Sequence, residues 1–187
     1  AKTRALIAQG ADIVNLTVGE PDFDTPEEIR EAAKRALDAG ITRYSPVPGL
    51  PDLRAAIAEK LKRDNGLDYS AEEIVVTNGA KQAISDTCLA FLEEGDEAII
   101  PSPYWAAYPG TVEFTGAKIV YAQTTLRSGF KLTPETLEAA ITPRSRLLFL
   151  NSPCNPTGAV YRRNELEALL EVVRAHPRLW ILSDEIY

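Results

Sequence analysis

The chain has 187 residues, of which 45% are hydrophobic and 25% charged, and its formal net charge is -7. This is the composition of a globular domain, and the length allows one sizeable core with part of a second domain. The acidic balance and the lack of any basic run argue against nucleic acid as a partner, because phosphate neutralisation needs a clustered Lys/Arg face. No stretch predicts a transmembrane helix or a signal peptide, so no membrane partner is expected.

Two cysteines, Cys88 and Cys154, are too few to cross-link a chain of this size, which favours a reducing, cytoplasmic location. The sequence contains no methionine, not even at position 1, and it stops abruptly after Ser183-Asp184-Glu185-Ile186-Tyr187. We therefore expect both ends of the natural protein to lie outside this chain.

The first third of the chain predicts two helices joined by an extended loop. Thr25-Pro26-Glu27-Glu28 combines a capping box with a proline at the first helical position, so a helix is expected from here to Gly40. A second helix is expected through residues 53–61, with its end at Asn65-Gly66. The prolines and the glycine of residues 44–49 indicate the loop between the two helices.

From residue 74 onward, short apolar runs alternate with helical patterns. Strands are predicted at residues 74–77, 98–100, 118–121, 147–150 and 180–182. Helices are predicted at residues 81–92, from Trp105, from Thr133-Pro134, and around Leu166 to Val173. This alternation predicts a three-layer α/β/α fold, in which helices cover both faces of a mostly parallel sheet. Trp180 lies inside an apolar run and is expected in the core.

Four polar or aromatic clusters directly follow predicted strands. They are Asn78-Gly79-Ala80-Lys81, Ser102-Pro103-Tyr104-Trp105, residues 151–158 and residues 184–187. Ligands of such sheets bind outside the carboxyl ends of the strands. We therefore expect the four clusters to meet at one edge of the sheet and to form the functional site.

The clusters allow several kinds of chemistry. The glycine turn before residue 81 suits an anion, although glycine at such a place is also common for purely structural reasons. Trp105 could stack on a flat heteroaromatic ring or pack in the core. Asp184 could bind a metal, act as a base or pair with a protonated ring nitrogen, but no second carboxylate cluster supplies further metal ligands, so no metal is expected. Cysteine catalysis by Cys154 is disfavoured because the only histidine, His176, is expected at the surface.

Six motifs, in order along the chain, are similar to those of class I aminotransferases. They are residues 18–23, Tyr44 with Gly49 and Leu53-Arg54, Gly79-Ala80-Lys81-Gln82, Pro103-Tyr104-Trp105, Asn155-Pro156-Thr157-Gly158, and Ser183-Asp184-Glu185-Ile186-Tyr187. The chain thus resembles a fold type I enzyme that depends on pyridoxal 5'-phosphate (PLP), and it is most similar to the bacterial aspartate aminotransferase branch. The resemblance extends over nearly the whole chain.

The resemblance implies PLP as the cofactor and gives each matching residue a role. Asp184 matches the carboxylate that keeps the pyridine nitrogen protonated, so that the ring can take up electrons released at the substrate Cα. Tyr187 and Asn155 match groups that hydrogen-bond the O3′ oxygen of the ring, and Trp105 matches the stacking aromatic. Gly79-Ala80-Lys81 matches the helix-start loop that holds the phosphate. Asp184 and Tyr187 are the expected catalytic residues.

The same resemblance implies a homodimer that acts on an amino acid and a 2-oxo acid. Tyr44 would reach the phosphate in the neighbouring subunit. Gly19, Trp105 and Asn155 match substrate contacts, with Gly19 and Asn155 at the α-carboxylate. Lys81 is expected to bind the distal carboxylate of aspartate or glutamate, and the alternative for it is an ordinary surface lysine.

The resemblance also implies what the chain lacks. In the family, the lysine that forms the Schiff base with PLP and the arginine that clamps the substrate α-carboxylate both come after the motif that ends here. We therefore expect a large domain that is incomplete at its C-terminus and a fragment that is inactive by itself. Residues 1–25 are expected to belong to the small domain or N-terminal arm, and residues 26–187 to the N-terminal part of the large PLP-binding domain.

The expected function of the complete protein is transamination between aspartate and a 2-oxo acid such as 2-oxoglutarate. Alternatives with the same fold are an aromatic, alanine or kynurenine aminotransferase and a β-lyase. A regulator that senses PLP is disfavoured because such proteins carry a basic winged-helix segment upstream, whereas residues 4–7 resemble an aminotransferase N-terminal helix. A nucleotide-binding Rossmann domain is disfavoured because the sequence lacks Gly-x-Gly-x-x-Gly and a P-loop.

Overall fold

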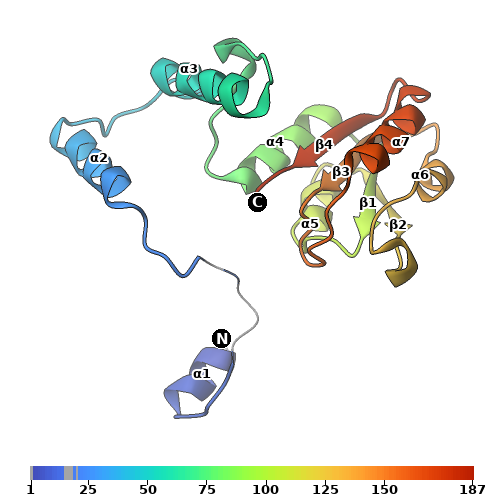
Figure 1. Ribbon diagram of the computed structural model, residues 1–187, viewed down its shortest axis with the longest axis horizontal. Helices are drawn as coiled ribbons and strands as arrows, with labels where there is room; N and C mark the ends of the chain where they lie inside the picture. Colours follow the sequence, from blue (N-terminus) through green and yellow to red (C-terminus); the bar gives the residue numbers. More distant parts are fainter. Residues whose placement is uncertain (1, 15–18, 20) are drawn as a thin grey trace. The chain divides into compact units, whose positions relative to one another are not determined.

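The computed structural model describes residues 2–14, 19 and 21–187, and the chain divides into two compact units, Ala1–Pro46 and Val47–Tyr187. The first unit contains helices α1 (Lys2–Ala8) and α2 (Glu27–Asp38), as Figure 1 shows. Val18 and Glu20 of the first predicted motif lie outside the described residues. The domain boundary predicted after residue 25 stays a prediction.

Helix α2 does not use the predicted capping box. Pro26 occupies the N-cap position with φ -49° and ψ 143°, and no side chain caps the helix. This extended ψ keeps Pro26 out of the helix, which therefore begins at Glu27, and Thr25 lies one residue too far away to cap it. Gly40 follows the helix with φ 73°, so the predicted end is confirmed.

The second unit opens with helix α3 (Pro51–Lys60) and then alternates helices and strands (Figure 1). A π-helical turn (Leu61–Asn65) continues α3, and Gly66 ends it with φ 67°, as the Asn-Gly pair predicts. A 3-10 turn (Ala71–Glu73) follows. The remaining elements are α4 (Ala80–Phe91), β1 (Glu97–Ser102), α5 (Tyr108–Glu113), β2 (Lys118–Gln123), a 3-10 turn (Leu126–Ser128), α6 (Pro134–Ala140), β3 (Ser145–Asn151), α7 (Arg163–Arg174) and β4 (Trp180–Asp184).

The four strands form a parallel sheet in the order β2-β1-β3-β4. The chain runs outward from β1 to β2 and then returns to the other side of β1 to form β3. A topological switch point therefore lies between β1 and β3, and ligands of open α/β sheets bind outside the carboxyl ends of the strands at such a point. The register places Asn151 at the end of β3 beside Asp184 at the end of β4.

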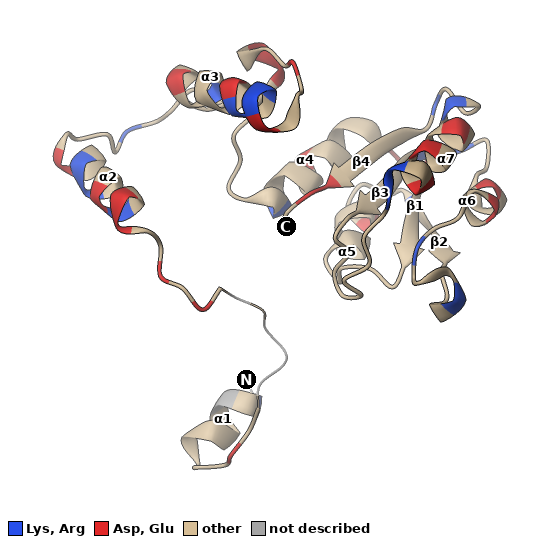
Figure 2. Ribbon diagram, in the orientation of Figure 1, with Lys and Arg blue, Asp and Glu red and all other residues tan. Residues whose placement is uncertain are grey.

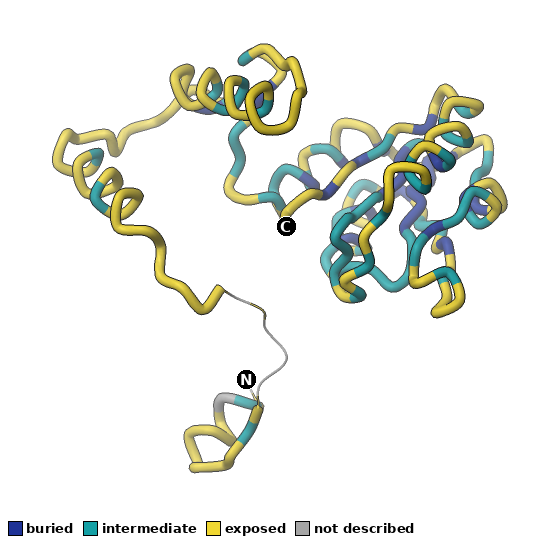
Figure 3. The backbone as a smooth tube through the Cα atoms, viewed as in Figure 1, coloured by how far each residue is buried: buried dark blue, intermediate teal, exposed yellow. Residues whose placement is uncertain are grey.

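Alternate residues of the strands pack into two hydrophobic clusters, one on each face of the sheet. One face packs against α4 and α5, through residues such as Ile84, Cys88, Ile100, Val112 and Phe149. The other packs against α6 and α7, through residues such as Ile99, Leu137, Leu148 and Leu169. Figure 3 shows the buried residues concentrated along the strands and on the helix sides that face them. The prediction of a three-layer α/β/α fold with a parallel sheet is thus confirmed.

The strand predicted at residues 74–77 is absent. The N–H of Val76 donates to the carbonyl of Pro48 at 2.9 Å, so this extended segment pairs with the loop before α3 and not with the sheet. Ile74 is buried, but Val75 is 63% exposed. The β-branched residues of this segment predicted a buried strand because such residues are common in strands. Residue type alone does not reveal which part of the backbone the segment pairs with.

Gly49 and Arg54, which belong to the motif around Tyr44, hold this segment in place. Gly49 has φ 104°, and a Cβ at this position would lie 2.7 Å from Cγ2 of Val76. Arg54 Nε donates to the carbonyl of Ile74 at 2.9 Å. The two residues therefore fix the segment that leads into the glycine turn at residue 79.

Trp180 is 57% exposed, so its predicted place in the core is wrong. It is the first residue of β4, an edge strand of the sheet, and its ring packs on Phe91 at the end of α4 with 5.4 Å between ring centroids. Its neighbours Leu179 and Leu182 supply the buried contacts of this region. An apolar run in the sequence does not reveal that the ring of Trp180 packs on Phe91 and is otherwise exposed.

Charged residues lie mainly on the helices. Figure 2 shows acidic and basic residues side by side on α2, α3 and α7. Among the residues that the structure describes, no helix combines the length and the apolar character that crossing a membrane requires.

Glu97, at the amino end of β1, is an exception, because its carboxylate is buried. It accepts hydrogen bonds from Thr142 Oγ1 and from Arg144, whose Nε lies 2.8 Å from Oε1. The bond from Thr142, and less strongly those from Arg144, lower the pKa of Glu97 below its usual 4.5 despite the opposing effect of burial. A carboxylate with a lowered pKa stabilises the fold above the pKa of the unfolded chain, and this contribution is lost as the pH falls through the folded pKa.

Glu97→Gln should therefore reduce the free energy of unfolding near neutral pH and flatten its decline on acidification below about pH 4.5. Urea unfolding of the full-length protein at a series of pH values measures both effects. Glu94→Gln, which changes an exposed neighbour, is the matched control and should follow the wild-type curve. An acid decline of wild-type steepness in Glu97→Gln would contradict the assignment.

Candidate functional site

The four clusters predicted to share one edge of the sheet do lie together. Asn151 Nδ2 donates to the carbonyl of Asp184 at 2.9 Å, and Cys154 Sγ lies 3.8 Å from the carbonyl of Pro103. Lys81 Nζ lies 5.3 Å from the centroid of the Trp105 ring, a cation–π contact. The loops after β1, β3 and β4 and the start of α4 are therefore parts of one site.

Asp184 is the buried carboxylate of this site. It ends β4, is only 9% exposed, and accepts a hydrogen bond of 2.6 Å at Oδ2 from the phenol of Tyr108. Burial, and less strongly the bond to Asp184, raise the pKa of Tyr108 well above its usual 10.0. The phenol consequently stays protonated and donates to the carboxylate at any physiological pH.

Trp105 lies half-buried beside the hydrophobic cluster that faces α4 and α5. Its ring meets that of Tyr108 edge-on, with 5.5 Å between centroids and an interplanar angle of 86°. Tyr108 thus touches both the indole and the carboxylate, so Trp105 and Asp184 are separated by a single side chain.

The start of α4 offers backbone donors to the same site. Gly79 has φ 79°, and no atom lies within 4 Å of the position that a Cβ would occupy. Within the described residues, the N–H groups of Ala80 and Lys81 have no acceptor, as is usual in the first turn of a helix. Ala80 and Asp184 line one cavity of about 310 Å³ between α4 and the end of β4. The positive end of the helix dipole there favours an anion.

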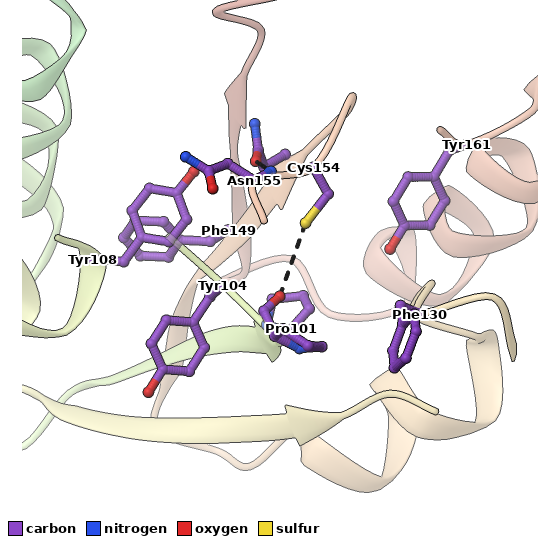
Figure 4. Close-up of a pocket in the computed structure, with 10 residues that line it drawn as sticks. Pro101, Tyr104, Tyr108, Phe130, Phe149, Cys154, Asn155 and Tyr161 are labelled. Atoms are coloured by element: carbon purple, nitrogen blue, oxygen red, sulfur yellow. Dashed lines mark hydrogen bonds between the residues drawn. The ribbon is translucent and has the colours of Figure 1, made fainter. Parts of the chain in front are cut away.

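Asn151 holds the loop after β3. Its Oδ1 accepts a hydrogen bond of 2.7 Å from the N–H of Asn155, while its Nδ2 donates to the carbonyl of Asp184. Asn155 and Tyr108 both line a second cavity, and Figure 4 shows Tyr161 and Phe130 on its opposite side. The side-chain amide of Asn151 therefore links the loop after β3, which contains Asn155 and is called the asparagine loop below, to the end of β4.

Asn151→Ala should lower the free energy of unfolding by about 2 kcal/mol, because two half-buried hydrogen bonds are lost, each of which contributes roughly 1 kcal/mol. Urea unfolding of the full-length protein measures the change. Asn164→Ala, at an exposed position of α7, is the control and should change stability by less than about 0.5 kcal/mol. Equal stability of Asn151→Ala and the wild type would show that the link contributes nothing.

Cysteine chemistry finds no support at this site. Burial raises the pKa of Cys88 to about 11, so this residue stays a thiol in the core. His176 lies against Glu138, with 3.4 Å between Nε2 and Oε2, and Cys154 contacts the carbonyl of Pro103.

Three further predicted site residues lie at exposed positions. Tyr187 follows β4 and is 72% exposed. Gly19 and Tyr44 are exposed residues of the first unit. The roles of these three residues stay predictions.

Tyr108 received no role from the sequence, and Asn151 was expected only as a member of the cluster of residues 151–158. Asn151 heads the asparagine loop and could have been proposed as its support, because asparagine readily bonds to nearby backbone. Tyr108 lies three residues after Trp105, a spacing that places the two on one side of a helical turn, but its partner Asp184 is 76 residues away. Nothing local in the sequence predicts that contact.

The residues at this edge fit PLP. A buried carboxylate with Oδ1 free of the Tyr108 bond can pair with the pyridinium nitrogen. The half-buried Trp105 can lie against the ring, and the unpaired N–H groups at the start of α4 can bind the phosphate. These three features match the edge, the face and the anionic end of the same molecule.

Comparison with known proteins gives consistent results. The family model "Aminotransferase class I and II" matches residues 11–187. The aspartate/prephenate aminotransferase of Cereibacter sphaeroides is 52% identical over 186 residues, with 100% of this chain and 46% of the relative covered. That of Thermus thermophilus is 51% identical over 187 residues, with 100% of this chain and 48% of the relative covered. The chain thus spans about half the length of these relatives.

Solved structures agree. The aspartate aminotransferase of Rhizobium meliloti superposes with a TM-score of 0.95 at 46% identity, over 100% of this chain and 46% of the other. A structure of the Thermus thermophilus aspartate aminotransferase with maleate gives a TM-score of 0.95 at 50% identity, over 100% and 48% of the two chains. The chain belongs to the class I and II aminotransferase family.

Proposed function

We propose that the full-length protein transfers the amino group of aspartate to a 2-oxo acid such as 2-oxoglutarate. Enzymes of this family use PLP. The observation that carries the proposal is the buried carboxylate of Asp184, fixed by Tyr108 at the sheet edge where α4 also begins. The names of relatives that are 52% and 51% identical to this chain support the proposal.

PLP supplies an electron-withdrawing ring that stabilises negative charge at the substrate Cα. Asp184 holds the proton on the ring nitrogen, and Trp105 fixes the plane of the ring. Asn155 and Tyr187 orient the ring through its O3′ oxygen, and Gly79-Ala80-Lys81 binds the phosphate through backbone N–H groups. These residues bind and orient, while the Schiff-base lysine is expected in the rest of the full-length protein.

Aspartate as the amino donor follows from Lys81. Its ammonium lies over the ring of Trp105, where it can bind a distal carboxylate. The Thermus thermophilus relative was solved with maleate, a four-carbon dicarboxylate like aspartate. Two relatives at 52% and 51% identity are named aspartate/prephenate aminotransferases, which favours prephenate as a second 2-oxo acid acceptor.

The active protein is proposed to be a homodimer. Tyr44 from one subunit would reach the phosphate in the other, and Gly19 would contact the substrate α-carboxylate through its backbone. The resemblance to the family supports both roles. The cytoplasmic location rests on the small number of cysteines.

Purified full-length protein tests the function directly. With PLP, aspartate and 2-oxoglutarate should yield oxaloacetate and glutamate, and the protein should show visible absorbance from bound PLP that changes when aspartate is added. Phenylalanine, alanine and kynurenine as donors test the runner-up aminotransferases, and prephenate tests the second acceptor. Release of ammonia and pyruvate from an amino acid would indicate a β-lyase. A protein that binds PLP without turnover of any of these substrates would favour a PLP-sensing regulator.

A further inference from the structure

We propose that Tyr108 is a positioning residue that fixes both Asp184 and Trp105 against the cofactor. The inference rests on the proposed function, which gives those two residues their places at the edge and the face of the PLP ring. Tyr108 matches none of the six motifs that carry the resemblance to aminotransferases, and it lies in the first turn of α5.

The phenol controls the orientation of the carboxylate. Tyr108 is 2% exposed and Asp184 is 9% exposed, so their bond of 2.6 Å is shielded from competing water. A short hydrogen bond to a charged acceptor in such surroundings is among the stronger kinds in proteins. With Oδ2 occupied by the phenol, Oδ1 is the oxygen left to face a ring nitrogen. Free rotation of the Asp184 side chain would spoil that pairing.

The ring of Tyr108 is itself held from two sides. Phe149 of β3 packs on it with 4.8 Å between centroids, at an interplanar angle of 46°. Trp105 meets it edge-on, and such T-shaped pairs resist rotation of either ring. The sheet therefore orients Tyr108 through Phe149, and Tyr108 in turn orients Trp105. Figure 4 shows Tyr108 and Phe149 in contact on one wall of the cavity.

A proton-transfer role does not fit Tyr108. Burial raises its pKa, so the phenol holds its proton, and its oxygen is directed at Asp184. Its contribution to the reaction is geometric and acts through the two residues that it touches.

Tyr108→Phe and Tyr161→Phe in the full-length protein form a matched pair. Each removes one phenol oxygen from the same cavity, but Tyr161 accepts a bond of 2.7 Å from the N–H of Leu132 and does not contact Asp184. We expect Tyr108→Phe to weaken PLP binding to the apoprotein about tenfold and to lower kcat about tenfold, with KM for aspartate within about twofold of wild type. Tyr161→Phe should leave the Kd for PLP and kcat within about twofold of wild type.

Tyr108→Leu, which also removes the ring that meets Trp105, should weaken PLP binding at least about threefold more than Tyr108→Phe. Thermal unfolding of each apoprotein serves to exclude a general loss of structure. A Kd for PLP in Tyr108→Phe within twofold of wild type overturns the carboxylate role, as does an equal loss in Tyr161→Phe. A leucine variant no worse than the phenylalanine variant overturns the indole role.

The outcomes separate this inference from the proposed function. If wild type binds PLP and transaminates while Tyr108→Phe is unchanged, only the inference fails. If wild type binds no PLP, both fail. A protein that binds PLP in a manner sensitive to Tyr108 but does not transaminate keeps the inference about the site and overturns the proposed reaction.

Discussion

Asp184→Asn in the full-length protein should lower kcat/KM for aspartate about a thousandfold. Asparagine has nearly the same shape and can still accept the hydrogen bond from Tyr108, so the substitution removes mainly the negative charge. Removal of one partner from a buried ion pair typically costs about 4 kcal/mol, which corresponds to about three powers of ten in rate. Steady-state kinetics with aspartate and 2-oxoglutarate measures the loss.

Asp68→Asn is the control for this experiment. Asp68 is exposed and pairs with Lys62 at the surface, with 3.0 Å between Oδ1 and Nζ, so its loss should leave kcat/KM within about twofold of wild type. A functional Asp184→Asn enzyme would mean that the charge at the end of β4 has no part in the reaction, and the assignment of the site would fail.

Lys81→Ala should raise KM for aspartate about thirtyfold while changing KM for phenylalanine by less than about threefold. A charge-assisted hydrogen bond to a substrate carboxylate contributes about 2 kcal/mol. Phenylalanine has no distal carboxylate, so it does not make this bond and loses nothing when Lys81 is removed. The cation–π contact with Trp105 is lost for both substrates and cancels in the comparison. The ratio of the two Michaelis constants is therefore the quantity to measure.

Lys118→Ala is the matched control for the lysine. Lys118 begins β2, at the end of the sheet opposite the site, and it is exposed. Its loss should leave both Michaelis constants unchanged. An equal effect of Lys81→Ala on aspartate and phenylalanine would remove Lys81 from substrate recognition and leave it an ordinary surface lysine.

The fold could be predicted from the sequence where apolar runs alternate with helical patterns, because each run and each helix is recognisable from neighbouring residues alone. Residues 98–100 and 147–150 are apolar runs buried on both faces, and each is followed by a helical pattern, so a parallel sheet followed directly. Residues 74–77 are also mostly apolar, but this segment bonds to the loop at Pro48 through the N–H of Val76. The apolar neighbours of Trp180 predicted a core position, although its ring packs on Phe91 and is otherwise exposed. In both failures the missing information was a tertiary partner.

The site could be predicted to the same extent. The rule that ligands bind at the carboxyl ends of parallel strands was enough to bring Lys81, Trp105 and Asp184 together. Tyr108 escaped because its role depends on a contact across 76 residues, which residue type and spacing do not encode. For Tyr44 and Gly19, neither the sheet-edge rule nor a local pattern predicts a role, and only the resemblance to a family gives them one.

The pairing of β3 with β4 has a consequence for the stability of the protein. Asp184 and Tyr108 meet only where β4 is paired with β3, so the bond between them exists only in the assembled sheet. A ligand held there binds the assembled sheet and not the unfolded chain. At a hundred times its Kd such a ligand adds about 2.7 kcal/mol of stability. Occupancy of this edge would therefore stabilise the pairing of β3 with β4 together with the rest of the fold.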